Sequence, residues 1–389
     1  MFFVLLAGCS GGSSEPSPAE KLQASVNADW TQYVQAHGLP GGGMAVYLET
    51  PGGNYFASCG MAAWVDQNTR FRIESNTKTF TAAAIMFLNQ QGMLNINDLI
   101  VSDIPGQGVP YIPATTQYNI PYKGSITIRQ LLSHTAGVFD ATNDPIPSTA
   151  PCVYAGVQDY TQYVLATDPY HQFSPDEFVG VDATCSLTYG PPGSVYHYSN
   201  TGYSLLAIII QRVSGLSYDQ FVMQNLVTPN GLASTSVPML ATDQAIPPPF
   251  NPGYLWNNGA FTDVTQSNMS AEIAEGNIIS TPADLARWVR RLIRGEAGLN
   301  SASIAAMETI TPPSKSYGLG IVNMGSLGYG HNGAGNGYVS NMAYDPVADV
   351  TTIVYCNVED YANVPTYELT LLVNASKDAR AAVGYHVSQ

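Results

Sequence analysis

The sequence has 389 residues, a length that allows either two domains or one large elaborated domain. Hydrophobic residues make up 45% of it, which is enough for a packed core and excludes an intrinsically disordered chain. Only 11% of the residues are charged, and 29 acidic side chains outnumber 14 basic ones to give a net charge of −15. Because nucleic-acid binding needs clustered lysine and arginine, a nucleic-acid partner is excluded as well.

The N-terminus resembles the end of a bacterial lipoprotein signal peptide. Residues 1–8 are apolar, lead directly into Cys9, and are too few to span a bilayer, which takes about 20 apolar residues. We therefore expect lipidation of Cys9, export to the bacterial cell envelope or periplasm, and a lipid anchor as the only membrane attachment; the alternative is an ordinary frayed N-terminus. The usual basic segment is missing, which indicates a truncated or differently assigned start. Residues 10–18, rich in Ser, Gly and Pro, predict a flexible tether.

Four further cysteines bear on the redox state of the chain. An exported protein meets an oxidising compartment, and Cys152 and Cys185 bracket one loop-rich segment, so we predict a disulfide between them. Cys59 and Cys356 fall in expected strands, where buried free thiols are the simpler interpretation. The histidines and cysteines lack the spacing of zinc ligands, and we expect neither a metal site nor a cofactor.

Strands are expected near both chain ends, with helices between them. Turn residues and hydrophobic periodicity predict, in chain order, a hairpin over 44–61, a buried helix over 75–91, an apolar helix over 203–213, a capped helix over 282–293, strands over 317–323, 337–344 and 350–355, and a helix over 366–382. This order favours an α/β protein of the α+β type, with an antiparallel sheet flanked by helices and completed by both chain ends. We expect one domain over 20–389, preceded by a leader and tether over 1–19. Its sheet part covers about 20–95 and 285–389, and an inserted, mostly helical part covers about 96–284.

The first chemical motif is Ser-Asn-Thr-Lys at 75–78, at the start of the expected buried helix. Residues three apart lie on one face of a helix, so the Lys78 amine can reach the Ser75 hydroxyl. Serine needs an adjacent base to become a nucleophile, and burial can lower the pKa of a lysine enough for that task. Free N–H groups at the helix start can stabilise an oxyanion. The alternative is an ordinary surface serine and lysine at helical spacing.

A second motif, Tyr-Ser-Asn at 198–200, directly precedes the second apolar helix. A tyrosine beside a lysine can move protons, and the Asn200 amide can bind a substrate carbonyl. The same Tyr-x-Asn pattern recurs at 355–357 and 361–363, but neither copy precedes a helix of this kind. The position of the motif directly before this helix therefore makes Tyr198 the candidate acid/base.

The third motif is His331-Asn332-Gly333, within the glycine-rich segment 328–337. Such glycine density lets a backbone approach a ligand closely. A phosphate-binding loop is excluded because Gly-Lys-Ser/Thr is missing. A tight turn between strands with an exposed histidine is the alternative.

In this order, the three motifs resemble those of the serine penicillin-recognising hydrolases, which include class C β-lactamases, D-alanyl-D-alanine carboxypeptidases and related esterases. Further similar segments surround them at 71–74, 128–137, 198–203, 276–281 and 317–320. The resemblance covers about residues 40–380. It implies a β-lactamase/transpeptidase-like fold and acyl transfer through a serine ester, without a cofactor.

The resemblance also implies a role for each motif residue. Ser75 would be the acylated nucleophile, Lys78 its base, and Tyr198 the acid/base that protonates the leaving group. The remaining set would bind substrate or the oxyanion: Asn200, His331, Asn332, Gly333 and Ala334. Among these, His331 would take the place of the cationic lysine of class C β-lactamases, and the N–H groups of Ser75 and Ala334 would form the oxyanion hole. Asn332 replaces the usual Thr or Ser, which weakens the case for recognition of a C-terminal carboxylate.

Three further interpretations concern the surroundings of the site. His134 lies in the similar segment 128–137, and we interpret it as structural. Two insert-like stretches, 141–193 and 241–270, are expected to shape the substrate cleft. Candidate wall residues in the second stretch are Tyr254, Trp256 and Phe261, with exposed loop aromatics as the alternative.

The expected function is that of a serine hydrolase whose partner is a small-molecule or peptide substrate. A D-amino-acid-containing peptide, such as a peptidoglycan stem peptide, is the first choice, as for a D-alanyl-D-alanine carboxypeptidase. Esterase or amidase action on small acyl compounds and class C-like β-lactamase action are alternatives. A penicillin- or peptide-binding protein without turnover is the alternative from another class. The sequence specifies no oligomeric state.

Overall fold

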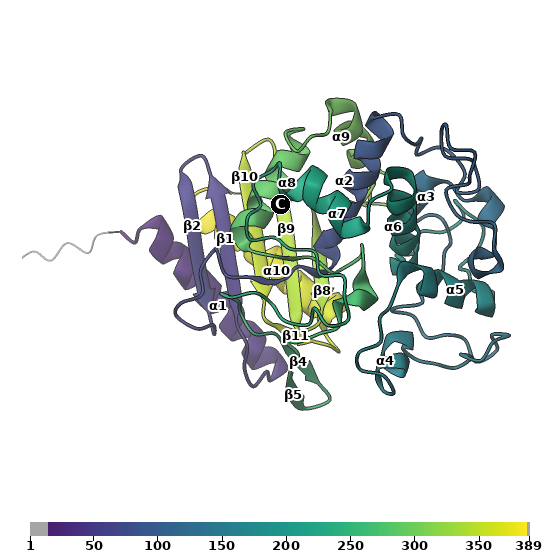
Figure 1. Cartoon of the computed structure of the whole chain (residues 1–389). Helices are drawn as coiled ribbons and strands as arrows, with labels where there is room; N and C mark the ends of the chain where they lie inside the picture. The colour runs from purple at the N-terminus through teal and green to yellow at the C-terminus, as the bar shows by residue number, and fades with distance from the viewer. Residues whose placement is uncertain (1–14, 387–389) are drawn as a thin grey trace, which may run out of the picture.

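An antiparallel six-stranded sheet forms one side of the molecule in the computed structural model, which describes residues 15–386 (Figure 1). Its strand order is β2-β1-β10-β9-β8-β7. The strands are β1 (Met44–Thr50), β2 (Gly53–Cys59), β7 (Val322–Asn323), β8 (Tyr329–Gly335), β9 (Tyr338–Asp345) and β10 (Val350–Cys356). Because β1 pairs directly with β10, both ends of the chain complete one sheet, as predicted.

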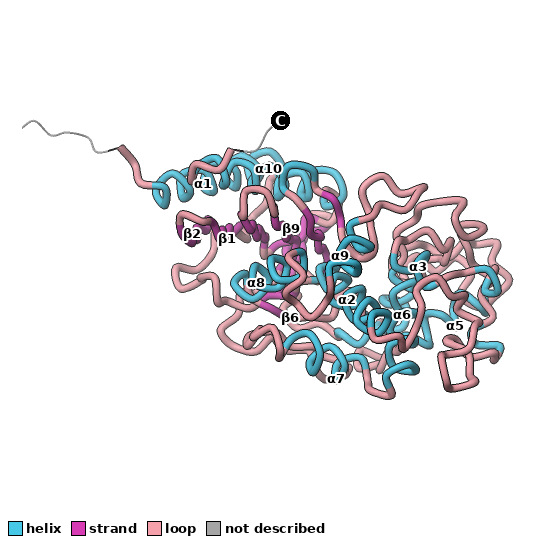
Figure 2. Tube along the Cα trace, turned by 90° about the horizontal axis from the view of Figure 1, so that it is seen from above, coloured by secondary structure: helices cyan, strands magenta, loops and turns pink. Residues whose placement is uncertain are grey.

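Helices cover both faces of this sheet (Figure 2). On one face, α1 (Pro18–His37) lies beside α10 (Leu369–Ala382), and on the other lies α8 (Pro282–Ile293). The start of α8 is as expected, because the Thr281 side chain accepts a hydrogen bond from the Asp284 N–H. Its apolar stripe is buried against the sheet, and this burial fixes the helix.

The helix α1 is absent from the predicted elements. Ser17 and Glu20 form a capping box at its start, and Pro18, which we assigned to the tether, is its first residue. Apolar side chains at helical spacing bury one face of α1 on the sheet: Leu22, Val26, Trp30 and Tyr33. Cys9 lies outside the described residues.

The remaining helices gather beside the sheet on the right of Figure 1. They are α2 (Thr77–Gln90), α3 (Ile128–Leu132), α4 (Tyr160–Leu165), α5 (Pro175–Cys185), α6 (Asn200–Ser214), α7 (Tyr218–Val222) and α9 (Ser301–Glu308). The helices α2 and α6 pack on each other and contribute to the largest apolar core. Among the described helices, none is long and apolar enough to cross a membrane.

Two small sheets complete the fold. The first pairs β3 (Phe71–Arg72) with β6 (Ile279–Ser280), and the second has the order β11-β4-β5. Its strands are β4 (Tyr254–Asn257), β5 (Ala260–Asp263) and β11 (Val358–Asp360). The first pair places the segment that leads into α2 beside the segment that leads into α8.

The expected strand over 317–323 is mostly wrong, because only β7 at its end pairs with the sheet. Upstream of β7 the backbone bonds to helical neighbours: the Leu319 N–H donates to the Met307 carbonyl at 2.9 Å, and the Gly320 N–H to the Leu132 carbonyl at 3.1 Å. This segment therefore joins the sheet to the helical part.

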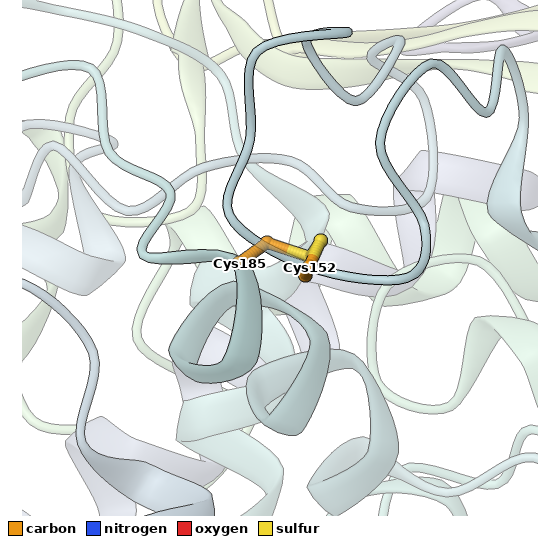
Figure 3. Close-up of a disulfide and its surroundings, with 2 residues drawn as sticks. All are labelled: Cys152 and Cys185. Atoms are coloured by element: carbon orange, nitrogen blue, oxygen red, sulfur yellow. A yellow bond between two sulfur atoms is a disulfide. The ribbon is translucent and has the colours of Figure 1, made fainter.

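Cys152 and Cys185 form a disulfide that ties a loop to the end of α5 (Figure 3). Cys59 and Cys356 are free thiols at the ends of β2 and β10. Both lie opposite Met44 of β1, one on each side of it.

Candidate active site

Ser75 and Lys78 meet at the start of α2. Ser75 lies in a 3₁₀ turn, Glu74–Asn76, that leads into the helix and leaves the serine partly exposed. One turn later, Lys78 is fully buried, and its Nζ lies 3.1 Å from Ser75 Oγ and 2.9 Å from the Glu275 carbonyl oxygen. Burial lowers the pKa of Lys78 to about 8, against an opposing effect of nearby carboxylates, chiefly Glu275. An amine at this distance and with this pKa can accept a proton from the Ser75 hydroxyl.

Tyr198 lies against the same amine. It directly precedes α6, where the Ser199 side chain caps the helix by accepting the Gly202 N–H. The Lys78 Nζ lies 4.8 Å from the centre of the Tyr198 ring. Burial raises the pKa of the phenol well above its ordinary value, and the nearby Ser75 hydroxyl opposes this only in part. Tyr198 thus stays protonated near neutral pH, and its shielded hydroxyl has no well-aligned partner within residues 15–386.

His134 supports Tyr198 from behind. Its ring stacks on the Tyr198 ring with centroids 4.2 Å apart, and its Nδ1 accepts the Ser199 N–H at 3.0 Å. Burial holds the pKa of His134 well below its ordinary value, so the ring is neutral. These contacts are those of a positioning residue, in line with the structural interpretation.

His331, the first residue of the third motif, is an uncharged side chain. It is buried on β8, its Nδ1–H donates to the Asn332 carbonyl at 2.5 Å, and its Nε2 accepts from the Tyr317 hydroxyl at 2.8 Å. Burial lowers the pKa of His331 to about 3. The imidazole of His331 is therefore neutral near neutral pH, unlike the lysine whose place it would take. The exposed-histidine alternative is wrong.

The glycine of the third motif allows β8 to lie directly against the turn that carries Ser75. A β-carbon on Gly333 would overlap the Ile73 carbonyl oxygen and lie 2.8 Å from Asn76 Nδ2. Ala334, the next residue, reaches the cavity beside Ser75. Asn332 does not line that cavity, and its buried Oδ1 has no hydrogen-bond partner in the described chain.

A cavity of about 340 Å³ opens beside Ser75. Asn200 lines it, and its Nδ2 donates to Thr142 Oγ1 at 3.0 Å. Both insert-like stretches contribute wall residues, as expected. Five acidic residues also line the cavity: Glu74, Asp159, Glu272, Glu275 and Glu359. None of the lining residues in the described part of the chain is a lysine, arginine or histidine.

Sequence reasoning missed this acidic lining, because its members come from distant segments and share no local pattern. In residues 15–386 no three His, Cys, Asp or Glu side chains are grouped so that they could hold a metal ion. The acidic residues therefore act on the cavity through their electrostatic effect.

The three candidate wall aromatics do not line the cavity. Tyr254 and Trp256 flank Leu255 on β4, and Tyr254 stacks on Phe261 of β5 with ring centroids 4.7 Å apart. Side chains alternate between the two faces of a strand, so Leu255 faces the cavity while both aromatic neighbours pack on the core beside the sheet. Glu359 of β11 lies opposite Leu255 in the register and faces the cavity as well.

Comparison with known proteins identifies the family. The Beta-lactamase family model matches residues 26–375, which is most of the chain. The chain belongs to the β-lactamase family. This agrees with the resemblance seen in the motifs and confirms the predicted fold class.

Several known proteins are similar to the chain. Penicillin-binding protein 4* of Bacillus subtilis is 31% identical over 173 residues, which cover 44% of this chain and 31% of that protein. The match therefore spans about a third of the length of that relative. The structure of a D-stereospecific amidohydrolase from Streptomyces sp. has a TM-score of 0.70 at 25% identity and covers 89% of this chain and 97% of that one. A D-amino acid amidase from Ochrobactrum anthropi SV3, complexed with L-phenylalanine amide, has a TM-score of 0.70 at 21% identity, covering 92% and 99% of the two chains, and shares the fold.

Proposed function

We propose that the protein is a serine hydrolase that cleaves small amides or peptides of D-amino acids through an ester on Ser75. The observation that carries this proposal is the 3.1 Å approach of the buried Lys78 amine to the Ser75 hydroxyl. A buried amine with a lowered pKa is the base that such a nucleophile needs. The similarity to a D-stereospecific amidohydrolase supports the choice of substrate.

The reaction begins with transfer of the Ser75 Oγ proton to neutral Lys78 Nζ, while Oγ forms a bond to the substrate carbonyl carbon. The N–H groups of Ser75 and Ala334 would hold the resulting oxyanion. When the tetrahedral intermediate collapses, the bond to the leaving amine breaks. Tyr198 donates a proton to that amine and regains one from the Lys78 ammonium. Water then attacks the carbonyl carbon of the Ser75 ester and gives a proton to neutral Lys78. When this second tetrahedral intermediate collapses, the bond to Ser75 Oγ breaks, Lys78 returns the proton to Oγ, and the acid is released.

The cavity favours amidase or esterase action over carboxypeptidase or β-lactamase action. A carboxypeptidase substrate and a penicillin both carry a carboxylate that needs a cationic or strong hydrogen-bonding partner. Here His331 is neutral, Asn332 lies outside the cavity lining, and the described lining residues include five acidic and no basic ones. An esterase for small neutral acyl compounds is the second candidate, because the same Ser75 chemistry serves both.

We further propose that the protein acts in the bacterial cell envelope, exported and lipid-anchored through Cys9. The disulfide between Cys152 and Cys185 supports this, because structural disulfides persist in oxidising compartments. In that compartment the enzyme would meet peptides that contain D-amino acids.

The test compares wild type and Ser75→Ala on four substrates: p-nitrophenyl acetate, D-alanine p-nitroanilide, a diacylated D-alanyl-D-alanine peptide and nitrocefin. We expect Ser75-dependent turnover of the first two, with at least about a thousandfold loss of kcat/KM in Ser75→Ala. Turnover confined to the peptide or nitrocefin would instead support carboxypeptidase or β-lactamase action. Unchanged turnover in Ser75→Ala would overturn the proposed nucleophile.

A further inference from the structure

Three carboxyl groups gather on one wall of the cavity beside Ser75. Asn336 links two of them, because its Nδ2 donates to Glu272 Oε1 and lies 3.4 Å from Glu74 Oε1. The third, Glu359, accepts the Gly337 N–H at 3.2 Å. These neutral donors occupy one oxygen of each carboxyl group. The Glu272 carboxyl also lies against the Glu74 carboxyl, a contact that raises the pKa of Glu74, and no amide or cationic side chain of the described residues donates to Glu272 Oε2.

Two glycines allow the backbone to lie directly against these carboxyl oxygens. A β-carbon on Gly276 would overlap Glu272 Oε2, and one on Gly335 would lie 2.8 Å from Glu74 Oε2. Both glycines line the cavity. The wall therefore consists of carboxyl oxygens packed directly against bare backbone.

Glu275 adds an independent observation. Its side chain is 1% exposed and lines the same cavity, and neither carboxyl oxygen has a hydrogen-bond partner within the described chain. A buried carboxyl without a partner is costly and indicates that a donor is missing. The backbone carbonyl of Glu275 accepts from Lys78 Nζ at 2.9 Å, and the charge of Lys78 lowers the pKa of the Glu275 carboxyl, so the carboxyl lies near the same amine.

Burial and mutual repulsion make ionisation of these carboxyl groups unfavourable in the absence of a ligand. Burial raises the pKa of Glu359 to about 7 and raises those of Glu74 and Glu275 well above the ordinary value. Repulsion from Glu272 adds to each shift. Arg72 counteracts part of this at Glu74, but its guanidinium donates to the carbonyls of Gln244 and Thr265 and does not line the cavity. A bound cation would relieve the repulsion.

We propose that this wall binds a primary ammonium group on the acyl part of the substrate, with Glu272 and Glu275 as its acceptors. This inference rests on the proposed function. Both residues belong to the short segment 272–276 that also holds Lys78, so the ammonium lies close to the scissile carbonyl, as in an unblocked amino acid amide. An ammonium donates up to three hydrogen bonds and matches the unpaired oxygens. A substrate blocked at this nitrogen loses both the charge and two of the donors.

The experiment measures kcat/KM for D-alanine p-nitroanilide and for its N-acetyl derivative at pH 7, with p-nitrophenyl acetate as a neutral reference. We expect a preference of at least about tenfold for the free amine, since charge-assisted hydrogen bonds contribute that much or more. Glu272→Gln keeps the size of the side chain and should reduce this preference about tenfold. Glu296→Gln removes the same charge at an exposed position beside Arg294 and should leave the preference as it is.

Two readouts separate this inference from the proposed function. Ser75-dependent turnover of p-nitrophenyl acetate without a preference for the free amine would overturn the inference alone. Calorimetric titration of Ser75→Ala with D-alaninamide and with N-acetyl-D-alaninamide measures binding without any turnover. Tighter binding of the charged amide supports the inference, and equal or weaker binding contradicts it, whatever the outcome for hydrolysis.

Discussion

Replacing Lys78 with methionine tests the assignment of the base. Methionine has nearly the same length and shape but cannot accept a proton, so the buried site stays filled. General-base catalysis typically contributes about 10²–10⁴ in rate. Because Ser75 has no other amine beside it among its assigned hydrogen bonds in the described chain, we expect kcat/KM for p-nitrophenyl acetate to fall by about a thousandfold.

The same substitution should change stability only slightly. Lowering the pKa of Lys78 from 10.5 to about 8 corresponds to about 3 kcal/mol of unfavourable burial of the charged amine near neutral pH, which methionine removes. Against this, the Glu275 carbonyl oxygen loses its donor, at a cost of about 1–3 kcal/mol. These effects nearly cancel, and we expect the melting temperature to stay within about 5 °C of wild type.

The assay is a pH profile of both proteins with p-nitrophenyl acetate, which has no ionisable group of its own in this range. Only neutral Lys78 can act as a base, so kcat/KM of wild type should rise tenfold per pH unit up to about pH 8 and then level off. Lys78→Met should lose both the rate and this rise. A folded variant that keeps activity within tenfold of wild type, or keeps the inflection near pH 8, would show that another group is the base.

Three further predictions follow from the contacts. Gly333→Ala should push β8 away from the Ser75 turn, lowering kcat/KM at least about tenfold and the free energy of unfolding by about 1–3 kcal/mol; wild-type kinetics and melting would contradict the close packing. Cys152→Ser should lower the free energy of unfolding in urea by about 3–4 kcal/mol, since the disulfide joins residues 33 positions apart, and reduction of wild type should have the same effect. Neutral His331, with its pKa lowered to about 3, should add no inflection between pH 5 and pH 7 to the ester profile, and a step near pH 6.5 that disappears in His331→Gln would contradict its neutrality.

The buried helices and the central strands could be predicted because their patterns are local. The segment 75–91 is apolar on nearly every side, and such a helix has to be buried. The helix α1 was missed although a signal was present: the Ser17–Glu20 capping box precedes apolar residues at helical spacing. The adjacent Ser/Gly/Pro-rich residues 10–18 predicted a flexible tether, and the start of the helix was assigned to it.

The motif residues were found because Ser75, Lys78 and Tyr198 belong to short patterns with a fixed order. The protonation state of His331 could not be found in the same way, because it depends on burial by β8 and on Tyr317. The charge of the cavity was likewise invisible, since Glu272 and Glu359 come from separate segments that only the fold brings together. Tyr254 and Trp256 were misplaced because 241–270 was expected only as an insert-like stretch, and β4, which turns Leu255 and not its neighbours toward the cavity, is visible only in the fold.

The most direct test of the account is the mass of the protein during turnover. Wild type is mixed with p-nitrophenyl acetate, quenched with acid within the first turnovers, and its intact mass and proteolytic peptides are measured. We expect one added acetyl group on the peptide that contains Ser75, and none on that peptide in Ser75→Ala. Steady turnover by Ser75→Ala at the wild-type rate, or an acetyl group that maps to another residue and turns over, would contradict acyl transfer through Ser75.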